Sequence, residues 1–120
     1  MDLANLPNLQ MISFIENHIT GTIPEEYGSM FNINDIELNR NALTGTLPEE
    51  LYNLVNINRL NVGSSLLTGT ISRKIGNLEK LSSLYIQRSA FNGTLPTEIR
   101  KLTTVSEFPL LTLALGRNTK

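Results

Sequence analysis

The tetrapeptide Gly-Thr-aliphatic-Pro recurs at a fixed interval of 24 residues, and this period constrains the fold more than any other feature of the sequence. A period between about 20 and 50 residues is typical of a solenoid, in which each repeat buries its apolar face only against its neighbours. The four copies, the third of which ends in serine instead of proline, are Gly21–Pro24, Gly45–Pro48, Gly69–Ser72 and Gly93–Pro96. The sequence therefore predicts a stack of similar coils that presents an extended surface.

Apolar residues occupy the same places in each repeat, together with a polar residue near the middle. In the second repeat these places hold Met30, Ile33, Ile36, Leu38, Asn41, Leu43, Leu47 and Leu51. With this spacing the chain resembles a leucine-rich repeat protein of the 24-residue type found in plant and algal receptor-like proteins, over roughly residues 3–104. The resemblance implies an α/β solenoid: a right-handed coil with a parallel β-sheet on its concave face and short helical or 3-10 turns on its convex side.

Parts of the repeat have direct physical readings. The step from Ile36 to Leu38 has a period of two, which predicts a short strand with one face turned inward. Pro24 predicts the opening of a short helical turn, where the helix dipole favours the carboxylates of Glu25 and Glu26. The recurring glycine predicts a place where a side chain would crowd the turn or the next coil.

The repeats are expected to form a single segment, 1–120, without a linker. Four full repeats are expected at 9–32, 33–56, 57–80 and 81–104, with partial repeats at both ends. An insertion of five residues within Thr103–Pro109 is expected to shift the frame of the last one. Neither end resembles the polar cap that a solenoid requires. We therefore expect a fragment of a longer solenoid, whose open ends are covered by further repeats or by a partner.

One column of polar residues is expected to tie the coils together where the chain leaves the strand. An asparagine side chain both donates and accepts, so it can pair backbone groups that the turn leaves unpaired. A serine hydroxyl cannot make all of these bonds. The structural ladder is predicted at Asn17, Asn41, Ser65 and Ser89.

The third repeat departs furthest from the pattern, because Ser72 replaces proline and Arg73 and Lys74 replace the acidic pair. This basic spot is interpreted either as drift without consequence or as a local binding feature.

Little in the sequence points to catalysis. The single histidine, His18, has no Cys, Asp or second His in register and is interpreted as a surface residue. The stacked pairs Glu25–Glu26 and Glu49–Glu50 could serve acid–base chemistry or hold a cation, although favourable electrostatics at the helix start explains them more simply. No nucleophile–base pair, metal-ligand spacing or phosphate-binding glycine loop is present. The chain is predicted to be non-enzymatic, with no cofactor and no metal; any kinase would lie outside it.

Charge and composition restrict the partners. A net charge of −1 argues against nucleic acid, and no apolar run is long enough to insert into a membrane. The absence of cysteine fits either a fragment without its capping regions or an intracellular protein. The sequence leaves the compartment unknown: the extracellular side of a membrane or secretion under a receptor-like reading, and otherwise the cytoplasm.

A binding surface is predicted on the concave sheet face, where outward side chains form columns across the repeats. Arginine and tyrosine often anchor interfaces, whereas acidic and basic residues on adjacent strands can instead form a solvated lattice of little energetic value. The residues proposed to bind ligand are Asp35, Glu37, Arg40, Arg59, Asn61, Tyr85 and Arg88.

Two classes of function remain open. The first is a non-catalytic recognition module, resembling part of the ligand-sensing ectodomain of a receptor-like protein or receptor-like kinase, with a protein, peptide or glycan ligand. The second is a soluble repeat scaffold or enzyme-inhibitor protein without a membrane link. Asn92, in the sequence Asn-Gly-Thr, is a possible glycosylation site if the protein is secreted.

Overall fold

Four short strands form the main sheet of the protein. The computed structural model describes residues 8–92 and 96–101, so the insertion predicted within Thr103–Pro109 lies outside the described residues. The strands are β1 (Met11–Ser13), β3 (Asp35–Glu37), β5 (Arg59–Asn61) and β7 (Ser83–Tyr85), which pair in this order and all in parallel. Each strand residue pairs with the residue 24 positions further on, as Ile36 does with Leu60. The predicted parallel sheet is therefore confirmed.

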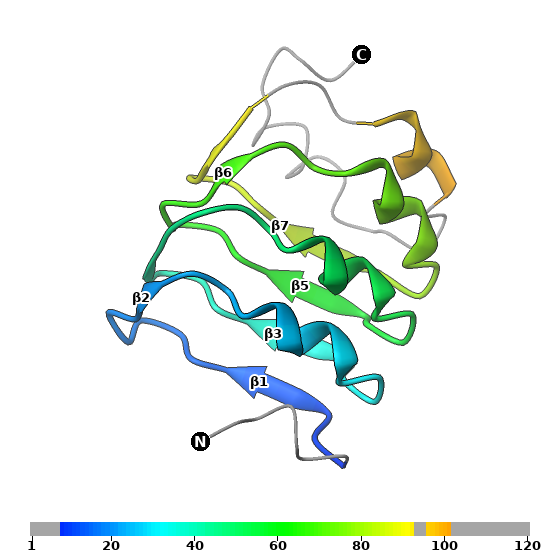
Figure 1. Ribbon diagram of the computed structural model, residues 1–120, viewed down its shortest axis with the longest axis horizontal. Coiled ribbons are helices and arrows are strands. Elements are labelled where there is room, and N and C mark those ends of the chain that lie inside the picture. The colour runs from blue at the N-terminus through cyan, green and yellow to red at the C-terminus, as the bar shows by residue number, and fades with distance from the viewer. Residues whose placement is uncertain (1–7, 93–95, 102–120) are drawn as a thin grey trace.

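The rest of each coil consists of a corner and a 3-10 turn. Two small parallel sheets form at the corners, β2 (Thr20–Gly21) with β4 (Ala42–Leu43) and β6 (Thr68–Gly69) with β8 (Ala90–Phe91). The 3-10 turns are η2 (Glu25–Ser29), η3 (Glu49–Asn53), η4 (Arg73–Asn77) and η5 (Thr97–Lys101). Figure 1 shows the rungs stacked in one direction, with the main sheet on one side of the coil and the 3-10 turns across from it.

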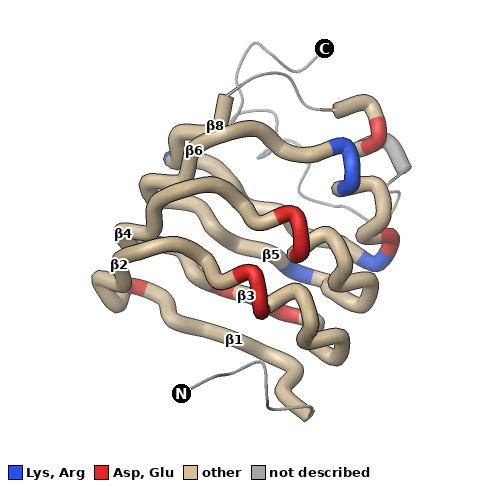
Figure 2. Tube along the Cα trace, in the orientation of Figure 1, with Lys and Arg blue, Asp and Glu red and all other residues tan. Residues whose placement is uncertain are grey.

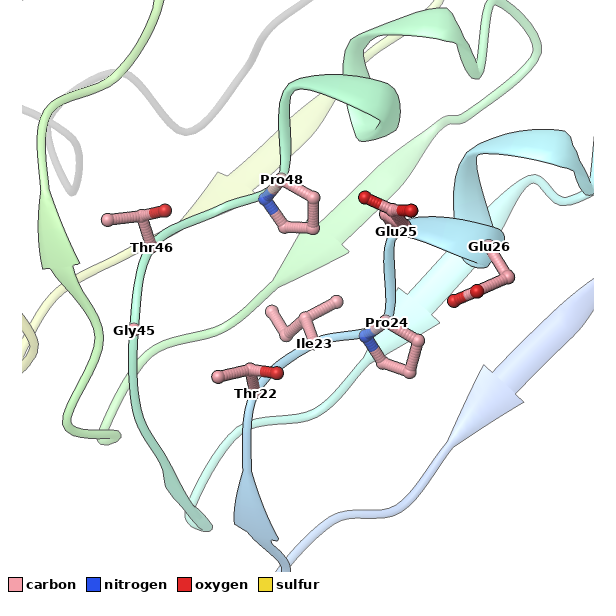
Figure 3. Close-up of a pocket in the computed structure, with 8 residues that line it drawn as sticks. All are labelled: Thr22, Ile23, Pro24, Glu25, Glu26, Gly45, Thr46 and Pro48. Carbon is pink, nitrogen blue, oxygen red and sulfur yellow. The ribbon is translucent and has the colours of Figure 1, made fainter.

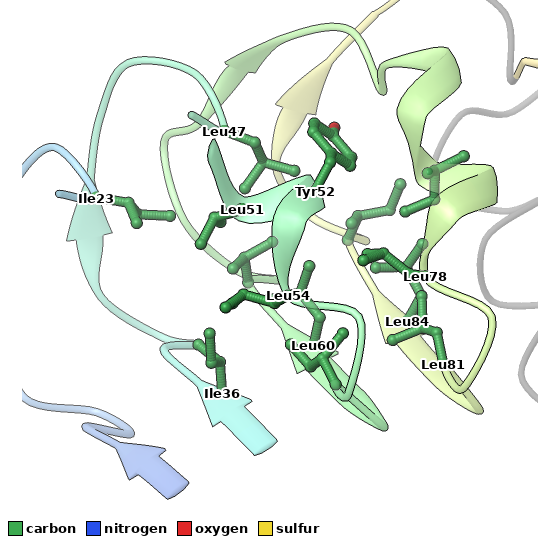
Figure 4. Packing of buried hydrophobic residues seen from close by; sticks show 14 of the residues in the cluster. Ile23, Ile36, Leu47, Leu51, Tyr52, Leu54, Leu60, Leu78, Leu81 and Leu84 are labelled. Atoms are coloured by element: carbon green, nitrogen blue, oxygen red, sulfur yellow. The ribbon is translucent and has the colours of Figure 1, made fainter. Parts of the chain in front are cut away.

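The core is a continuous column of aliphatic side chains between the sheet and the 3-10 turns (Figure 4). Each inward position of the second and third repeats is buried, and complete burial of one such side chain contributes roughly 1.5–3 kcal/mol. In the first described rung, Leu9, Phe14, Ile19 and Tyr27 are only partly buried. The fully buried side chains include Ile33, Ile36, Leu54, Ile57, Leu67, Ile75, Leu78, Leu81 and Leu84.

The glycine of the repeat is required by backbone conformation first and by crowding second. Gly21, Gly45 and Gly69 have φ values of +87°, +82° and +89°, a region that residues with a side chain rarely adopt. A Cβ at Gly45 would also come within 3.0 Å of the Thr22 methyl group, whereas a Cβ at Gly21 would meet nothing within 4 Å. Crowding, the reason expected from the sequence, therefore does not apply to Gly21.

At Asn41 the ladder asparagine both accepts and donates hydrogen bonds to backbone groups, as predicted. Its side-chain oxygen accepts from the backbone N–H groups of Asn17 and Ile19, at 3.0 and 2.9 Å. Its NH₂ group donates to the carbonyl oxygens of Phe14 and Leu38. Asn41 is buried and joins two coils, whereas Asn17 is exposed and its side chain donates only to the nearby Ile15 carbonyl.

The serines further along the ladder make fewer bonds. The Ser65 hydroxyl donates to the Val62 carbonyl at 2.7 Å and lies 3.0 Å from the Ser89 hydroxyl, which also reaches that carbonyl at 3.1 Å. The two serines thus share one acceptor, and the several backbone bonds made by Asn41 are reduced to a small hydroxyl cluster.

The missing proline of the third repeat is compensated locally. Pro24 and Pro48 lie one residue before their 3-10 turns, with φ values of −66° and −63°, and Ser72 adopts nearly the same conformation with φ −70°. Its hydroxyl accepts from the Lys74 N–H at 3.1 Å and so caps η4. Its backbone N–H, which a proline would lack, donates to the hydroxyl of buried Tyr52 at 3.1 Å.

Replacing Asn41 by alanine tests the ladder. Asn41→Ala leaves two backbone N–H groups without their acceptor, so we expect the free energy of unfolding to fall by about 2–4 kcal/mol. Asn17→Ala is the matched control, because it occupies the same place one repeat earlier and makes a single exposed bond. Urea denaturation followed by circular dichroism measures both changes, and equal losses would show that Asn41 has no special role.

The Tyr52–Ser72 hydrogen bond is testable by a double-mutant cycle. Tyr52→Phe removes the acceptor for the Ser72 N–H, and we expect a loss of about 1 kcal/mol in the native background. In a Ser72→Pro background that N–H no longer exists, so the same Tyr52→Phe change should be neutral or stabilising. Thermal unfolding of the four proteins gives the coupling energy. A Tyr52→Phe effect that is the same in both backgrounds would exclude this compensation.

Candidate functional site

The exposed face of the main sheet is where the structure brings most of the predicted binding residues together. Along each strand the middle residue points into the core, as Ile36 and Leu60 do, and the flanking residues point outward. Pairing in register then stacks the outward residues into columns, with Glu37 opposite Asn61 and Asn61 opposite Tyr85. Of the predicted residues, five lie on these strands: Asp35, Glu37, Arg59, Asn61 and Tyr85.

Arg40 and Arg88 lie beyond the strands, each three residues after the last residue of its strand. Both have left-handed backbone conformations, with φ values of 61° and 60°. Glu16 and Ser64 occupy the equivalent places and have φ values of 58° and 50°. Since none of these residues is glycine, asparagine or aspartate, the sequence carries no signal for this conformation.

Ion pairs between rungs neutralise part of this face. Arg59 donates to Glu37 at 3.0 Å, and Arg40 pairs with Glu16 of the preceding rung. The solvated lattice, the alternative expected from the sequence, therefore accounts for Glu37, Arg59 and Arg40, although Arg40 pairs with Glu16 rather than with Asp35 or Glu37. Arg88 is exposed and has no ion-pair partner within residues 8–92 and 96–101.

Among the carboxylates of this face, Asp35 has a raised pKa. Burial raises the pKa of Asp35 above its ordinary value, and the neighbouring Glu37 carboxylate adds to the rise, whereas Arg59 opposes it. One carboxylate oxygen of Asp35 is buried and has no hydrogen-bond partner. Ionised Asp35 is therefore poorly accommodated by the free protein.

A depression of about 620 Å³ lies on this face, at the end of the strands that leads into the left-handed turns. Four of the predicted binding residues, Arg40, Asn61, Tyr85 and Arg88, line it. Residues that were not predicted as site residues complete the lining: Asn39, Gly63, Ser64 and Gln87. The sequence could have indicated three of them, because Asn39, Gly63 and Gln87 are spaced by the repeat interval of 24 residues and so fall in one column.

A second depression, of about 710 Å³, lies beside the start of η2 (Figure 3). Its lining includes the rings of Pro24 and Pro48, the side chain of Thr46 and the carboxylates of Glu25 and Glu26. The acidic pair lies in the first turn of η2, as predicted. Within the described chain no group of three or more His, Cys, Asp or Glu residues could hold a metal ion, and none of the helices there could cross a bilayer.

The basic spot of the third repeat takes part in ion pairs with the neighbouring rungs. Figure 2 shows acidic pairs at the start of η2 and η3, and a basic pair at the same place in η4. Arg73 lies 3.2 Å from Glu98, and Lys74 lies 3.3 Å from Glu49. Because both basic side chains are paired on the surface, these contacts favour drift without consequence over a local binding feature.

The remaining predicted sites are single residues. His18 is exposed, with a left-handed φ of 56°. Asn92 is also exposed, whereas the Gly93 and Thr94 that complete its glycosylation sequence lie outside the described residues. Glycosylation at Asn92 stays a prediction.

Comparison with solved structures defines the class of this protein. No protein-family model matches the chain, and no curated protein matches it. The plant peptide hormone receptor RGFR1 in complex with RGF2 is 33% identical with a TM-score of 0.84, over 86% of this chain and 16% of that chain. The structure of PEPR1–AtPEP1 is 32% identical with a TM-score of 0.85, over 88% of this chain and 15% of that chain.

A third structure comes from Arabidopsis thaliana: the leucine-rich repeat ectodomain of the membrane receptor kinase GASSHO1/SCHENGEN3, in complex with CASPARIAN STRIP INTEGRITY FACTOR 2. It is 36% identical with a TM-score of 0.83, over 88% of this chain and 13% of that chain. The stacked parallel rungs, the 3-10 turns and these similarities define a leucine-rich repeat solenoid. The chain is similar to leucine-rich repeat proteins of the plant receptor type, and it spans well under a fifth of the length of these three chains.

Replacing Asp35 tests the electrostatics of the face. Folding raises the pKa of Asp35, so its contribution favours folding at low pH and is lost as the pH rises through the folded-state value. Asp35→Asn should therefore raise Tm by a few degrees at pH 7, and the gain should shrink as the pH approaches the ordinary aspartate value of about 3.9.

Thermal unfolding at several pH values measures this effect. Glu50→Gln is the control, because it also removes a carboxylate but lies exposed in the first turn of η3, away from Asp35, and should not raise Tm at pH 7. An Asp35→Asn gain that does not change with pH would rule out the electrostatic origin.

Proposed function

We propose that this chain is a non-catalytic recognition module, part of the ligand-sensing ectodomain of a receptor-like protein or receptor-like kinase. The ligand is a protein or a peptide that binds the exposed face of the main sheet. The single observation that carries the proposal is the depression on this face, where Arg40, Asn61, Tyr85 and Arg88 meet. Under this proposal the face lies on the extracellular side of a membrane, and any kinase lies elsewhere on the protein.

The chemistry of the depression supports recognition. Its volume of about 620 Å³ falls within the range of ligand sites, roughly 300–1,000 Å³. Arginine and tyrosine offer large contact areas and directed hydrogen-bond donors, which is why they often carry binding energy. The ectodomain structures compared above include complexes with RGF2, with AtPEP1 and with CASPARIAN STRIP INTEGRITY FACTOR 2. These complexes support a peptide as the class of ligand to test first.

Peptide selection against the full 120-residue chain tests this proposal. Random 12-residue peptides displayed on phage are selected on the immobilised chain, and the affinities of the enriched peptides are measured by biolayer interferometry. In the test variant, Arg40→Gly and Arg88→Gly remove both arginine side chains and allow the left-handed backbone. We expect at least tenfold weaker binding to this variant, which corresponds to about 1.4 kcal/mol.

The matched control is Arg73→Ala combined with Lys74→Ala, which removes the same charge from η4 on the other side of the coil. Binding to the control should stay within about twofold of the native value. Equal losses in both variants would indicate attraction by net charge alone. Peptides that bind both variants as well as the native chain would overturn the assignment of the face and leave a soluble scaffold as the better reading.

A further inference from the structure

A groove lies on the 3-10 side of the coil, between two adjacent rungs and across from the main sheet. It is the depression of about 710 Å³ beside the start of η2, and we call it the proline groove. Figure 3 shows the rings of Pro24 and Pro48 on neighbouring rungs, with the carboxylates of Glu25 and Glu26 on one side of them. The threonine side chains lie on the other side of the rings. The groove therefore has apolar walls and one acidic end.

The backbone explains why the two rungs stand apart here. At the corner they are joined by a bond from Thr44 N to Gly21 O, at 2.8 Å. Beyond that bond the segments 22–24 and 46–48, all of them described, are joined by no backbone hydrogen bond. A proline has no N–H and cannot donate to such a ladder, so Pro24 and Pro48 present their rings to the groove instead.

The acidic end of the groove carries charge that the described part of the chain does not neutralise. Glu25 and Glu26 are exposed, and neither belongs to an ion pair within residues 8–92 and 96–101. The next rung repeats the acidic pair at the start of η3, so like charges stack on this side (Figure 2). Lys74 reaches this stack, but its amine lies 3.3 Å from Glu49 rather than near η2.

The third repeat shows that the fold does not require this chemistry. Arg73 and Lys74 begin η4 after Ser72, yet η4 is a 3-10 turn of the same five residues as η2 and η3. The dipole at the start of a helical turn favours a carboxylate, but repulsion between acidic pairs on adjacent rungs opposes this gain. Local stability therefore does not account for two prolines combined with an uncompensated acidic pair.

An arginine side chain matches both parts of the groove. Its aliphatic stem can lie along apolar surface such as the rings of Pro24 and Pro48, while its charged head stays at the edge. Its guanidinium group is a planar fork that can donate to two carboxylate oxygens at once, whereas lysine offers a point charge. A metal ion would not use the apolar walls, and the described residues hold no group of three or more His, Cys, Asp or Glu suited to one.

We propose that the proline groove docks an arginine-bearing segment of a protein partner. The guanidinium group binds Glu25 and Glu26, and apolar residues beside the arginine pack against Pro24 and Pro48. A volume of about 710 Å³ lies within the usual range of binding sites, roughly 300–1,000 Å³, and leaves room for a short segment. Because the main sheet lies across the coil, this partner is distinct from the ligand proposed for the sheet face.

The experiment titrates blocked model peptides into the ¹⁵N-labelled full chain and follows them by NMR. The probe is Ac-Ala-Leu-Arg-Leu-Ala-NH₂, compared with the same peptide carrying lysine or the neutral analogue citrulline in place of arginine, and with spermidine. We expect the arginine peptide to shift the backbone signals of Glu25 and Thr46 in a saturable way, without shifting that of Asn61. The citrulline peptide should bind at least about tenfold more weakly, because it cannot make charge-assisted hydrogen bonds.

Variants separate binding from folding. Glu25→Gln combined with Glu26→Gln should weaken the arginine peptide at least about tenfold, whereas the matched control, Glu16→Gln combined with Glu98→Gln, should stay within about twofold. Glu25→Arg combined with Glu26→Lys copies the start of η4, so it should keep the native Tm and abolish binding.

Pro48→Ser tests the apolar wall of the groove. This change copies Ser72, which precedes a 3-10 turn of the same length, so we expect the turn to remain. The arginine peptide should bind about threefold more weakly, because the variant offers less apolar area to bury.

Four results would overturn the proposal. They are the absence of a saturable shift at Thr46, equal binding of the citrulline peptide, spermidine binding as tight as that of the arginine peptide, and equal losses in the glutamine variant and its control. The second would remove the role of charge, and the third and fourth would indicate attraction of any cation. None of them bears on the sheet face, so the proposed function would stand.

Discussion

Parallel pairing between residues 24 positions apart is the constraint on which this structure depends. Backbone bonds such as Leu38 N to Asn61 O, at 2.8 Å, and Val62 N to Tyr85 O, at 2.9 Å, hold each rung in the same register as the previous one. Because the main sheet keeps this register from β1 to β7, equivalent strand positions form columns across its four strands. The inward columns form the aliphatic core, and the outward columns form a surface to which each rung contributes one side chain per column.

Departures from the repeat are absorbed by neighbours rather than by the fold as a whole. Tyr52 supplies the acceptor that the Ser72 N–H needs, and Ser65 and Ser89 share a carbonyl where an asparagine would join two coils. In a solenoid each repeat contacts only the repeats beside it, so compensation has to come from within about one rung. A departure from the repeat therefore points to the neighbouring residue that compensates for it, as Ser72 points to Tyr52. Nothing in the repeat pattern itself distinguishes such a residue.

Much of this architecture follows from the sequence because it depends on spacing. The strands around Ile36 and Leu60, the acidic first turn of η2 and the ladder role of Asn41 all follow from period and residue type. The two-residue corner strands beginning at Thr20 and Thr68 do not, because segments this short have no periodicity to detect.

The site is predictable only in part, for a related reason. Strand alternation places Asp35, Glu37, Arg59, Asn61 and Tyr85 outward, but it does not reach Arg40 and Arg88, which lie in left-handed turns beyond the ends of the strands. The buried side-chain oxygens of Asn39 and Gln87 have no hydrogen-bond partner, and no sequence pattern could show this, because the lack of a partner is a property of three-dimensional packing.

At the left-handed turns, the residue that is best for stability differs from the residue that is best for the chemistry of the surface. Arg40 and Arg88 occupy a backbone conformation that costs a residue with a side chain about 1 kcal/mol relative to glycine. Selection for stability alone would move both positions toward glycine, which removes the side chains that give the rim of the depression its charge. These positions thus trade thermal stability for recognition chemistry, and variants chosen only for a higher melting temperature would tend to lose their arginines first.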